Sequence, residues 1–302
     1  SVRRLAIERY LTKEAPEAVE IADIFKQNDS SIKTIASGLH GIMYPYQVLT
    51  DPSFDFVIRG DGESEIVTLM KSIRSQNIQK FKNIWSKQIK KGNVRIVALP
   101  ESISTNLDTL PLPNFSLLPM EKYLHRDIGF ITGDFSLKRV FRFSASRGCK
   151  YKCTFCTYPF YGYSRMRNET IIKHLDDIVA RFDPDIVFFD DAEFFLQKQD
   201  TLELLNIFET RYRFKCITTS RAQYYRKDYI SKDFMQRFSP RWIIWDVGAE
   251  SGNQSRLYEI NKGITIQDLK IVADYAGEVG VRAAFSFMVA MPGETEQEML
   301  NT

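Results

Sequence analysis

The chain has 302 residues, enough for about two domains, and its 44% hydrophobic and 26% charged residues are typical of a globular protein. Its 41 basic and 38 acidic side chains leave a net charge of only +3, which gives no support for binding to nucleic acid. No apolar run approaches the roughly 20 residues of a membrane helix, and the first residues lack the apolar stretch of a signal peptide.

The first 75 residues alternate between helical and extended patterns. Apolar spacing predicts helices over 15–26 and 63–73, and short buried strands over 32–36 and 54–58. Such alternation is typical of a parallel, doubly wound sheet, but two strands are too few for a sheet that stands alone. We therefore expect residues 1–75 to be the C-terminal part of a Rossmann-like domain. The lack of an initiator Met leads us to expect a piece of a longer chain.

Residues 76–138 are less regular, with one candidate strand at 93–98 and several prolines, and we expect them to connect two domains. From residue 139 the alternation becomes sharper. The pattern predicts five successive strand–helix units, with strands over 140–144, 186–189, 215–219, 242–247 and 281–289. Residues 139–302 are therefore expected to form a partial parallel (β/α) barrel that is cut off at its C-terminus. Chemistry in such α/β folds belongs to the C-terminal ends of the strands.

Three cysteines, Cys149, Cys153 and Cys156, follow the first of these strands directly. Three of the four cysteines within eight residues indicate a metal site in a reducing compartment, so we expect a cytoplasmic protein. Three thiolates on a four-iron cluster would leave one iron open for a further ligand. A helical core stripe is a weaker explanation, because Lys and Thr lie between the cysteines. A zinc site is also weaker, because the three histidines lack the usual close spacing.

The spacing of these cysteines, with Phe155 just before the last, resembles the signature loop of the radical S-adenosylmethionine superfamily. The resemblance covers about residues 139–302. It implies a 4Fe-4S cluster on the three cysteines that reductively cleaves S-adenosylmethionine to a 5'-deoxyadenosyl radical. It also implies a one-electron donor, such as a flavodoxin or ferredoxin, and a small-molecule or peptide substrate.

Polar residues at the ends of the second and third strands are further candidates. In the resembled family, the acids after the second strand contact the amino group of S-adenosylmethionine, and here Asp190, Asp191 and Glu193 are all available. Which acid acts stays open, and so does a plain role as solvated loop residues. Arg221 follows the third strand and either pairs with a surface acid or binds the methionine carboxylate.

The fourth and fifth strands complete the resemblance. Glu250 and Ser251 end a segment, followed by Asn261-Lys262-Gly263, that resembles the ribose-binding strand of the superfamily, with a structural turn as the alternative. Met288 lies in a strand that resembles the one flanking the adenine, and it would serve equally well as a core residue.

The front part, over about residues 15–130, resembles the second half of the cobalamin-binding domain of one subgroup of this superfamily. Gly38 would then let the backbone approach the nucleotide tail of the cofactor, or serve only the turn. The Asp-x-His-x-x-Gly motif that ligates cobalt in that family is absent. If cobalamin is bound, the resemblance implies methyl transfer to a poorly activated carbon. The alternatives are a radical rearrangement, cyclisation or oxidation and, less favoured, a non-catalytic iron–sulfur or zinc protein.

Overall fold

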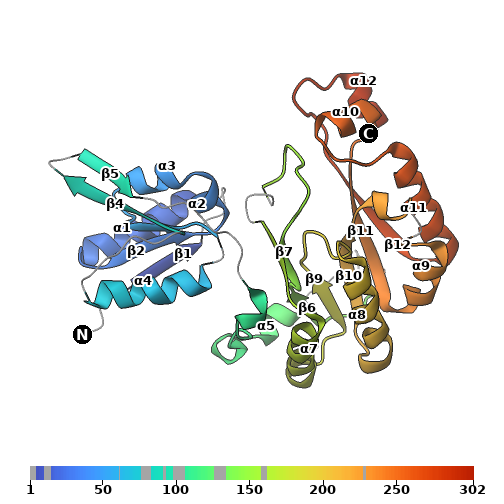
Figure 1. Ribbon diagram of the computed structural model, residues 1–302, viewed down its shortest axis with the longest axis horizontal. Coiled ribbons are helices and arrows are strands. Elements are labelled where there is room, and N and C mark those ends of the chain that lie inside the picture. Colours follow the sequence, from blue (N-terminus) through green and yellow to red (C-terminus); the bar gives the residue numbers. More distant parts are fainter. Residues whose placement is uncertain are drawn as a thin grey trace. The chain divides into compact units, whose positions relative to one another are not determined.

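The computed structural model describes residues 5–9, 15–60, 62–75, 83–90, 93–97, 106–125, 134–157, 162–226 and 229–302. The chain divides into two compact units, the first made up mainly of Ser1–Thr105 and the second mainly of residues from Asn106 onward. Each unit has its own five-stranded sheet (Figure 1). Within the described parts, no helix combines the length and the apolar character that crossing a membrane requires.

The sheet of the first unit has the strand order β1-β2-β3-β4-β5. Strands β1 (Leu5–Arg9), β2 (Lys33–Ser37) and β3 (Phe56–Ile58) are parallel to one another. Strand β4 (Ile84–Lys90) pairs antiparallel with β3 on one side and with β5 (Asn93–Val97) on the other. The expectation of only two strands here was therefore wrong. The sheet continues through β4 and β5 into the stretch that we expected to be a connector.

Helices cover both faces of this sheet, because successive strand residues point to opposite sides. Ala36 and Val57 pack with residues of α1 (Ala15–Asn28) and α3 (Pro45–Thr50) on one face. Ile35 and Phe56, one position away in each strand, pack with α4 (Glu63–Ser75) on the other. The short helix α2 (Leu39–Met43) follows β2 directly.

The second unit is built on an open, all-parallel sheet whose strands follow the chain in order. This confirms the predicted α/β class and the partial barrel. The strands are β6 (Val140–Phe143), β9 (Ile186–Phe189), β10 (Lys215–Ser220), β11 (Trp242–Glu250) and β12 (Arg282–Phe287). Sequential order is the expected result when each strand is joined to the next by a right-handed helical crossover.

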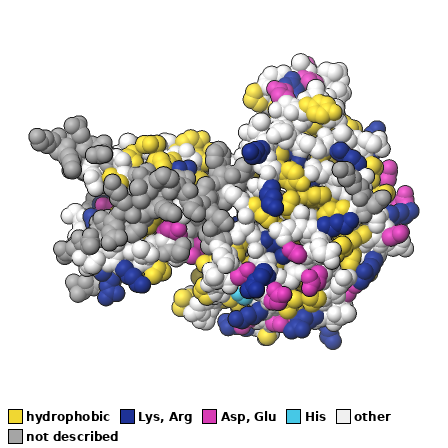
Figure 2. Space-filling model, viewed as in Figure 1, with side chains coloured by type: hydrophobic (Ala, Val, Ile, Leu, Met, Phe, Trp, Pro, Cys, Tyr) yellow, Lys and Arg dark blue, Asp and Glu magenta, His cyan; other side chains and the backbone are white. Residues whose placement is uncertain are grey.

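The crossover helices bury one face of this sheet in the largest hydrophobic core of the molecule. They are α7 (Asn168–Phe182), α8 (Lys198–Arg211), α9 (Lys232–Phe238) and α11 (Ile266–Val279). The opposite face buries a smaller group of side chains, Val140, Ile186, Ile217 and Ile244. Hydrophobic side chains, with Lys and Arg beside them, also gather in the middle of this unit in Figure 2.

Shorter elements connect and flank these strands. A two-stranded antiparallel hairpin, β7 (Ser146–Gly148) and β8 (Tyr163–Arg165), brackets the cysteine segment. The described parts of the chain also contain the short helices α5 (Glu121–Leu124), α10 (Gln254–Glu259) and α12 (Glu296–Asn301), and 3-10 turns at Leu107–Thr109, Phe115–Leu117, Ala222–Tyr224 and Ser239–Arg241.

Candidate functional site

The three clustered cysteines lie on a loop that begins where β7 ends. Gly148, the last residue of β7, has a φ of 74°, a left-handed conformation that glycine adopts without strain, and it turns the chain into Cys149. All three thiols are free; Cys153 is buried, and Cys149 and Cys156 are half-buried. The loop therefore holds three thiols that are not in disulfide bonds within one short segment.

This loop is held against the turn between α10 and α11. The backbone N–H of Thr154 donates to the carbonyl of Ile260 at 3.0 Å, and the side-chain amide of Asn261 donates to the carbonyl of Lys152 at 3.0 Å. Among the described residues, no three His, Cys, Asp or Glu side chains are arranged around a single metal ion. A four-iron cluster has a different requirement, because each thiolate binds its own iron and the sulfur atoms stay apart.

Two N–H groups are directed at the cysteine sulfurs. Nη1 of Arg221 lies 3.7 Å from Sγ of Cys153, and the backbone N–H of Tyr151 donates to Cys149. Burial raises the pKa of Cys149, while this backbone hydrogen bond and the charge of Arg221 act in the opposite direction. Hydrogen bonds to sulfur stabilise the thiolate form that ligates iron, so the donor set fits an iron–sulfur cluster.

Two of the three candidate acids after β9 already have partners from distant parts of the chain. Asp190 accepts hydrogen bonds from Nε and Nη2 of Arg142 in β6, and the Nε contact is 2.6 Å. Asp191 accepts from the Ala145 backbone N–H at 3.1 Å and from the Ser146 hydroxyl. Burial raises the pKa of Asp191 to about 6 in spite of these bonds. Asp191 thereby anchors the start of the cysteine hairpin.

Glu193, the third acid, is buried and differs from the other two. Its Oε1 accepts no hydrogen bond from the residues that the structure describes, although the carboxylate interacts with the Phe195 N–H. Burial raises its pKa to about 8, and the positive charges of Arg221 and Lys262 oppose that rise. A buried acceptor without a donor is costly, so this oxygen is the one best suited to a positively charged ligand.

Glu250, at the end of β11, forms a buried ion pair with Lys262. The distance between Oε1 and Nζ is 2.6 Å, and both side chains are about one-tenth exposed. Glu250 has a φ of 66° at an irregularity in the pairing of β11 with β12. Left-handed backbone in a non-glycine residue is strained, and such strain is found preferentially at functional sites. A Cβ at Gly248 would lie 2.5 Å from Oε1 of Glu250, so a larger residue there would displace the ends of the paired side chains.

The other predicted residues of the second unit lie close to Glu250. The buried hydroxyl of Ser251 lies 3.1 Å from that of Thr302, which follows α12, and it accepts from the Asn253 N–H at 3.1 Å. Met288 donates its backbone N–H to the Glu250 carbonyl at 2.8 Å, and its side chain packs against the large core. Gly38 belongs to the first unit, where it precedes α2 with a φ of 92°.

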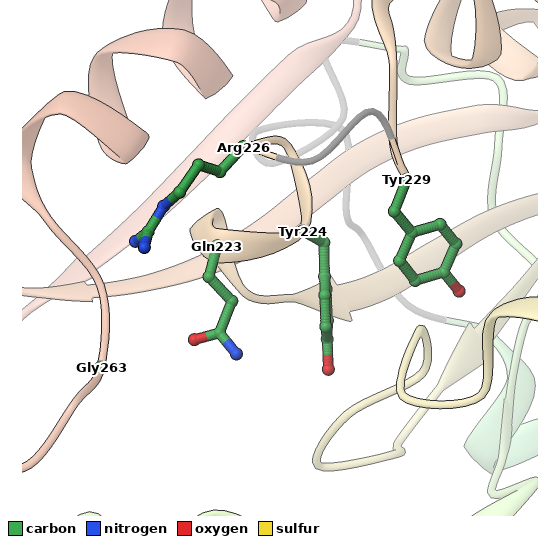
Figure 3. Close-up of a pocket in the computed structure, with 5 residues that line it drawn as sticks. All are labelled: Gln223, Tyr224, Arg226, Tyr229 and Gly263. Atoms are coloured by element: carbon green, nitrogen blue, oxygen red, sulfur yellow. The ribbon is translucent and has the colours of Figure 1, made fainter.

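A pocket of about 300 Å³ adjoins the residues that support the loop. It is lined by Gln223, Tyr224, Arg226, Tyr229 and Gly263 (Figure 3). In this view Gln223, Tyr224 and Tyr229 point to one side, and Arg226 extends in another direction. Gln223 donates to the hydroxyl of Tyr151 at 2.7 Å, so the pocket wall and the cysteine loop share a hydrogen bond.

Sequence reasoning had assigned no role to Lys262, Tyr151 or Gln223. Lys262 could have been found from the sequence, because it lies in the Asn261-Lys262-Gly263 segment that follows the strand end at Glu250. Tyr151 lies between two predicted ligands, but nothing in the sequence indicates its partners. Gln223 carried no signal, because a glutamine after a strand is ordinary on a protein surface.

The strand-end arrangement agrees with a match to a known family model. Residues 143–302 match the model of the Radical SAM superfamily, which is more than half of the chain. The chain belongs to the radical SAM superfamily. Membership implies a 4Fe-4S cluster and S-adenosylmethionine as cofactors, as the resemblance of the cysteine loop had implied.

Curated relatives of this radical SAM chain span most of its length. It is 26% identical over 290 residues to an uncharacterized methyltransferase of Pyrococcus horikoshii, and the match covers 94% of the chain and 59% of the relative. It is 23% identical over 293 residues to the anaerobic magnesium-protoporphyrin IX monomethyl ester cyclase of Rubrivivax gelatinosus, covering 95% of the chain and 51% of the relative. The chain thus spans little more than half the length of these two proteins.

Among solved structures, the fold resembles the radical S-adenosylmethionine methyltransferase TsrM from Kitasatospora setae, solved with cobalamin and a 4Fe-4S cluster bound. The TM-score is 0.72 and the identity 14%, and the match covers 97% of this chain and 58% of that one. At this identity the likeness establishes the shared fold, and it extends over both units of the radical SAM chain.

Proposed function

We propose that Cys149, Cys153 and Cys156 bind a 4Fe-4S cluster and that Glu193 binds the amino group of S-adenosylmethionine. The unpartnered, buried Oε1 of Glu193 carries this assignment. An ammonium group would supply the missing donor and would favour the ionised carboxylate. We assign Glu250 and Ser251 to the ribose and Met288 to the adenine. A cluster held by these cysteines would, once reduced, supply the electron that breaks the sulfur–C5′ bond of S-adenosylmethionine into methionine and a 5'-deoxyadenosyl radical.

Glu193→Gln, compared with Asp190→Asn, tests the ligand assignment. Asp190 is the matched control, because it belongs to the same loop but its carboxylate is taken up by Arg142. Loss of a hydrogen bond to a charged group costs about 1.5 to 3 kcal/mol, or roughly ten- to a hundredfold in affinity. Calorimetric titration should show this fall in affinity for S-adenosylmethionine in Glu193→Gln but not in Asp190→Asn, when the two variants hold equal amounts of iron. Equal affinities in both variants would contradict the assignment.

The radical reaction is tested on the anaerobically reconstituted protein. With S-adenosylmethionine and a one-electron reductant such as dithionite or a reduced flavodoxin, we expect 5'-deoxyadenosine by liquid chromatography. A Cys153→Ala variant should form none, because one of the three thiolate ligands is lost. If the wild-type protein holds a full cluster but forms no 5'-deoxyadenosine, the proposed reaction is wrong.

We further propose that the first unit binds cobalamin, with Gly38 beside its nucleotide tail, and that the whole protein transfers a methyl group to a poorly activated carbon of a small-molecule or peptide substrate. The support is the fold shared with TsrM and the methyltransferase name of the Pyrococcus horikoshii relative. Cobalamin uptake, followed by its visible absorbance after gel filtration, tests this step. No uptake would favour the alternative of a radical cyclisation or rearrangement, and the cyclase name of the Rubrivivax gelatinosus relative agrees with that alternative.

A further inference from the structure

Arg221 lies directly between the cysteine loop and the end of β10. Its side chain is buried, with the residue only 6% exposed. The carbon of its guanidinium is 3.8 Å from the centre of the Tyr151 ring, and its Nη1 is 3.7 Å from Sγ of Cys153. A cation is thus stacked on one residue of the loop while it donates to the sulfur of another.

The rest of the guanidinium is held by acceptors within the chain. Nη2 donates to the carbonyl of Lys262, and Nε donates to Oε1 of Gln223 at 3.3 Å. Gln223 in turn donates to the Tyr151 hydroxyl, which also lies 3.0 Å from that of Tyr224. All three nitrogen atoms of Arg221 therefore have acceptors within the chain, and the orientation that brings Nη1 to the sulfur is fixed from several sides.

A buried positive charge that donates to a ligand sulfur acts differently on the two redox states of a cluster. One-electron reduction adds a negative charge beside the thiolates, so a nearby N–H donor and cation stabilise the reduced state more than the oxidised state. The charges of Arg221 and Glu193 both act on Cys149, and the charges of Arg221 and Lys262 act on Glu193. Among these groups, Arg221 is the one that donates to a cysteine sulfur.

We propose that Arg221 is a positioning residue that raises the reduction potential of the cluster through Cys153, in place of binding the carboxylate of S-adenosylmethionine. This inference rests on the proposed binding of the cluster by the three cysteines. Arg221 would then make reduction of the cluster more favourable, and other groups would bind the methionine carboxylate.

The test compares the wild-type protein with Arg221→Gln, Arg221→Lys and the control Arg226→Gln. Arg226 lies five residues further on and is paired with Asp268, so its loss removes the same charge from the same segment. After anaerobic reconstitution, iron and sulfide are quantified and the midpoint potential is measured by redox titration with electron paramagnetic resonance. Affinity for S-adenosylmethionine is measured separately by calorimetry.

For Arg221→Gln we expect the equilibrium constant for reduction to fall about tenfold, which equals about 59 mV for a one-electron couple. Arg221→Lys should lie between it and the wild type, because it keeps the charge but loses the planar fork. Arg226→Gln should keep the wild-type potential, and affinity for S-adenosylmethionine should be equal in all four proteins.

Several results would overturn this assignment. An unchanged potential in Arg221→Gln would do so, and so would a selective loss of S-adenosylmethionine affinity, which would identify Arg221 as a carboxylate ligand. If both Arg221 variants fold by circular dichroism but hold no iron, the residue is a scaffold for the loop and not a determinant of potential. Failure of the wild-type protein to take up iron and sulfide would instead refute the proposed function, and this inference with it.

Discussion

Glu193→Gln should stabilise the iron-free protein relative to the wild type, and the gain should grow as the pH rises. Burial raises the pKa of Glu193 from 4.5 to about 8, so between these values the folded state holds a proton that the unfolded chain has released. The contribution of protonated Glu193 to the free energy of unfolding is therefore fully present below the pKa of the unfolded chain. It falls by about 1.4 kcal/mol for each pH unit until the folded pKa is reached, about 4 to 5 kcal/mol in total.

Urea unfolding of the chelated protein over about pH 5 to 9 measures this effect. The difference in unfolding free energy between Glu193→Gln and the wild type should rise across that window and become constant above about pH 8. A buried amide adds an offset that does not depend on pH, so the slope decides the question. The raised pKa of Asp191, about 6, acts in both proteins and cancels in the comparison. Parallel curves for the two proteins would refute the reasoning.

Three further substitutions test the packing at the end of β11, the first two by thermal unfolding and the third by limited proteolysis. Lys262→Met leaves Glu250 buried without its partner and should cost about 3 to 5 kcal/mol, most of which Glu250→Gln in the same chain should restore. Gly248→Ala should also destabilise the protein, because the added Cβ would lie 2.7 Å from Nζ of Lys262; Gly277→Ala, whose added Cβ meets no atom within 4 Å, should not. Gly252→Ala should release α12, because the added Cβ would overlap the Asn301 carbonyl, and faster proteolysis of this helix would reveal it.

Local spacing was enough to predict the cysteine loop and the strand order of the second unit. The interval between Cys149 and Cys156, and the alternation of apolar strands with helices, are properties of short segments that need no knowledge of distant contacts. The predicted number of strands in the first unit was too low, in part because local spacing does not reveal β4. Strand β4 (Ile84–Lys90) carries Ser, Lys and Gln among its apolar residues, and its place in the sheet depends on pairing with β3.

The availability of each candidate side chain was decided only by tertiary structure. The sequence alone hardly distinguishes the three acidic residues of one short segment, Asp190, Asp191 and Glu193. Arg142 and the Ser146 hydroxyl, more than 40 positions earlier in the chain, take up the first two, while Glu193 is buried with one oxygen left open.

The sequence by itself thus determined the family, the loop that carries the three clustered cysteines and the edge of the sheet where polar groups converge. The folded structure decided which of those groups is free to bind a ligand. It also turned Arg221 toward Cys153 and paired Glu250 with Lys262. The physical reason is that desolvation and pairing depend on neighbours brought close by the fold, and sequence spacing carries little information about them.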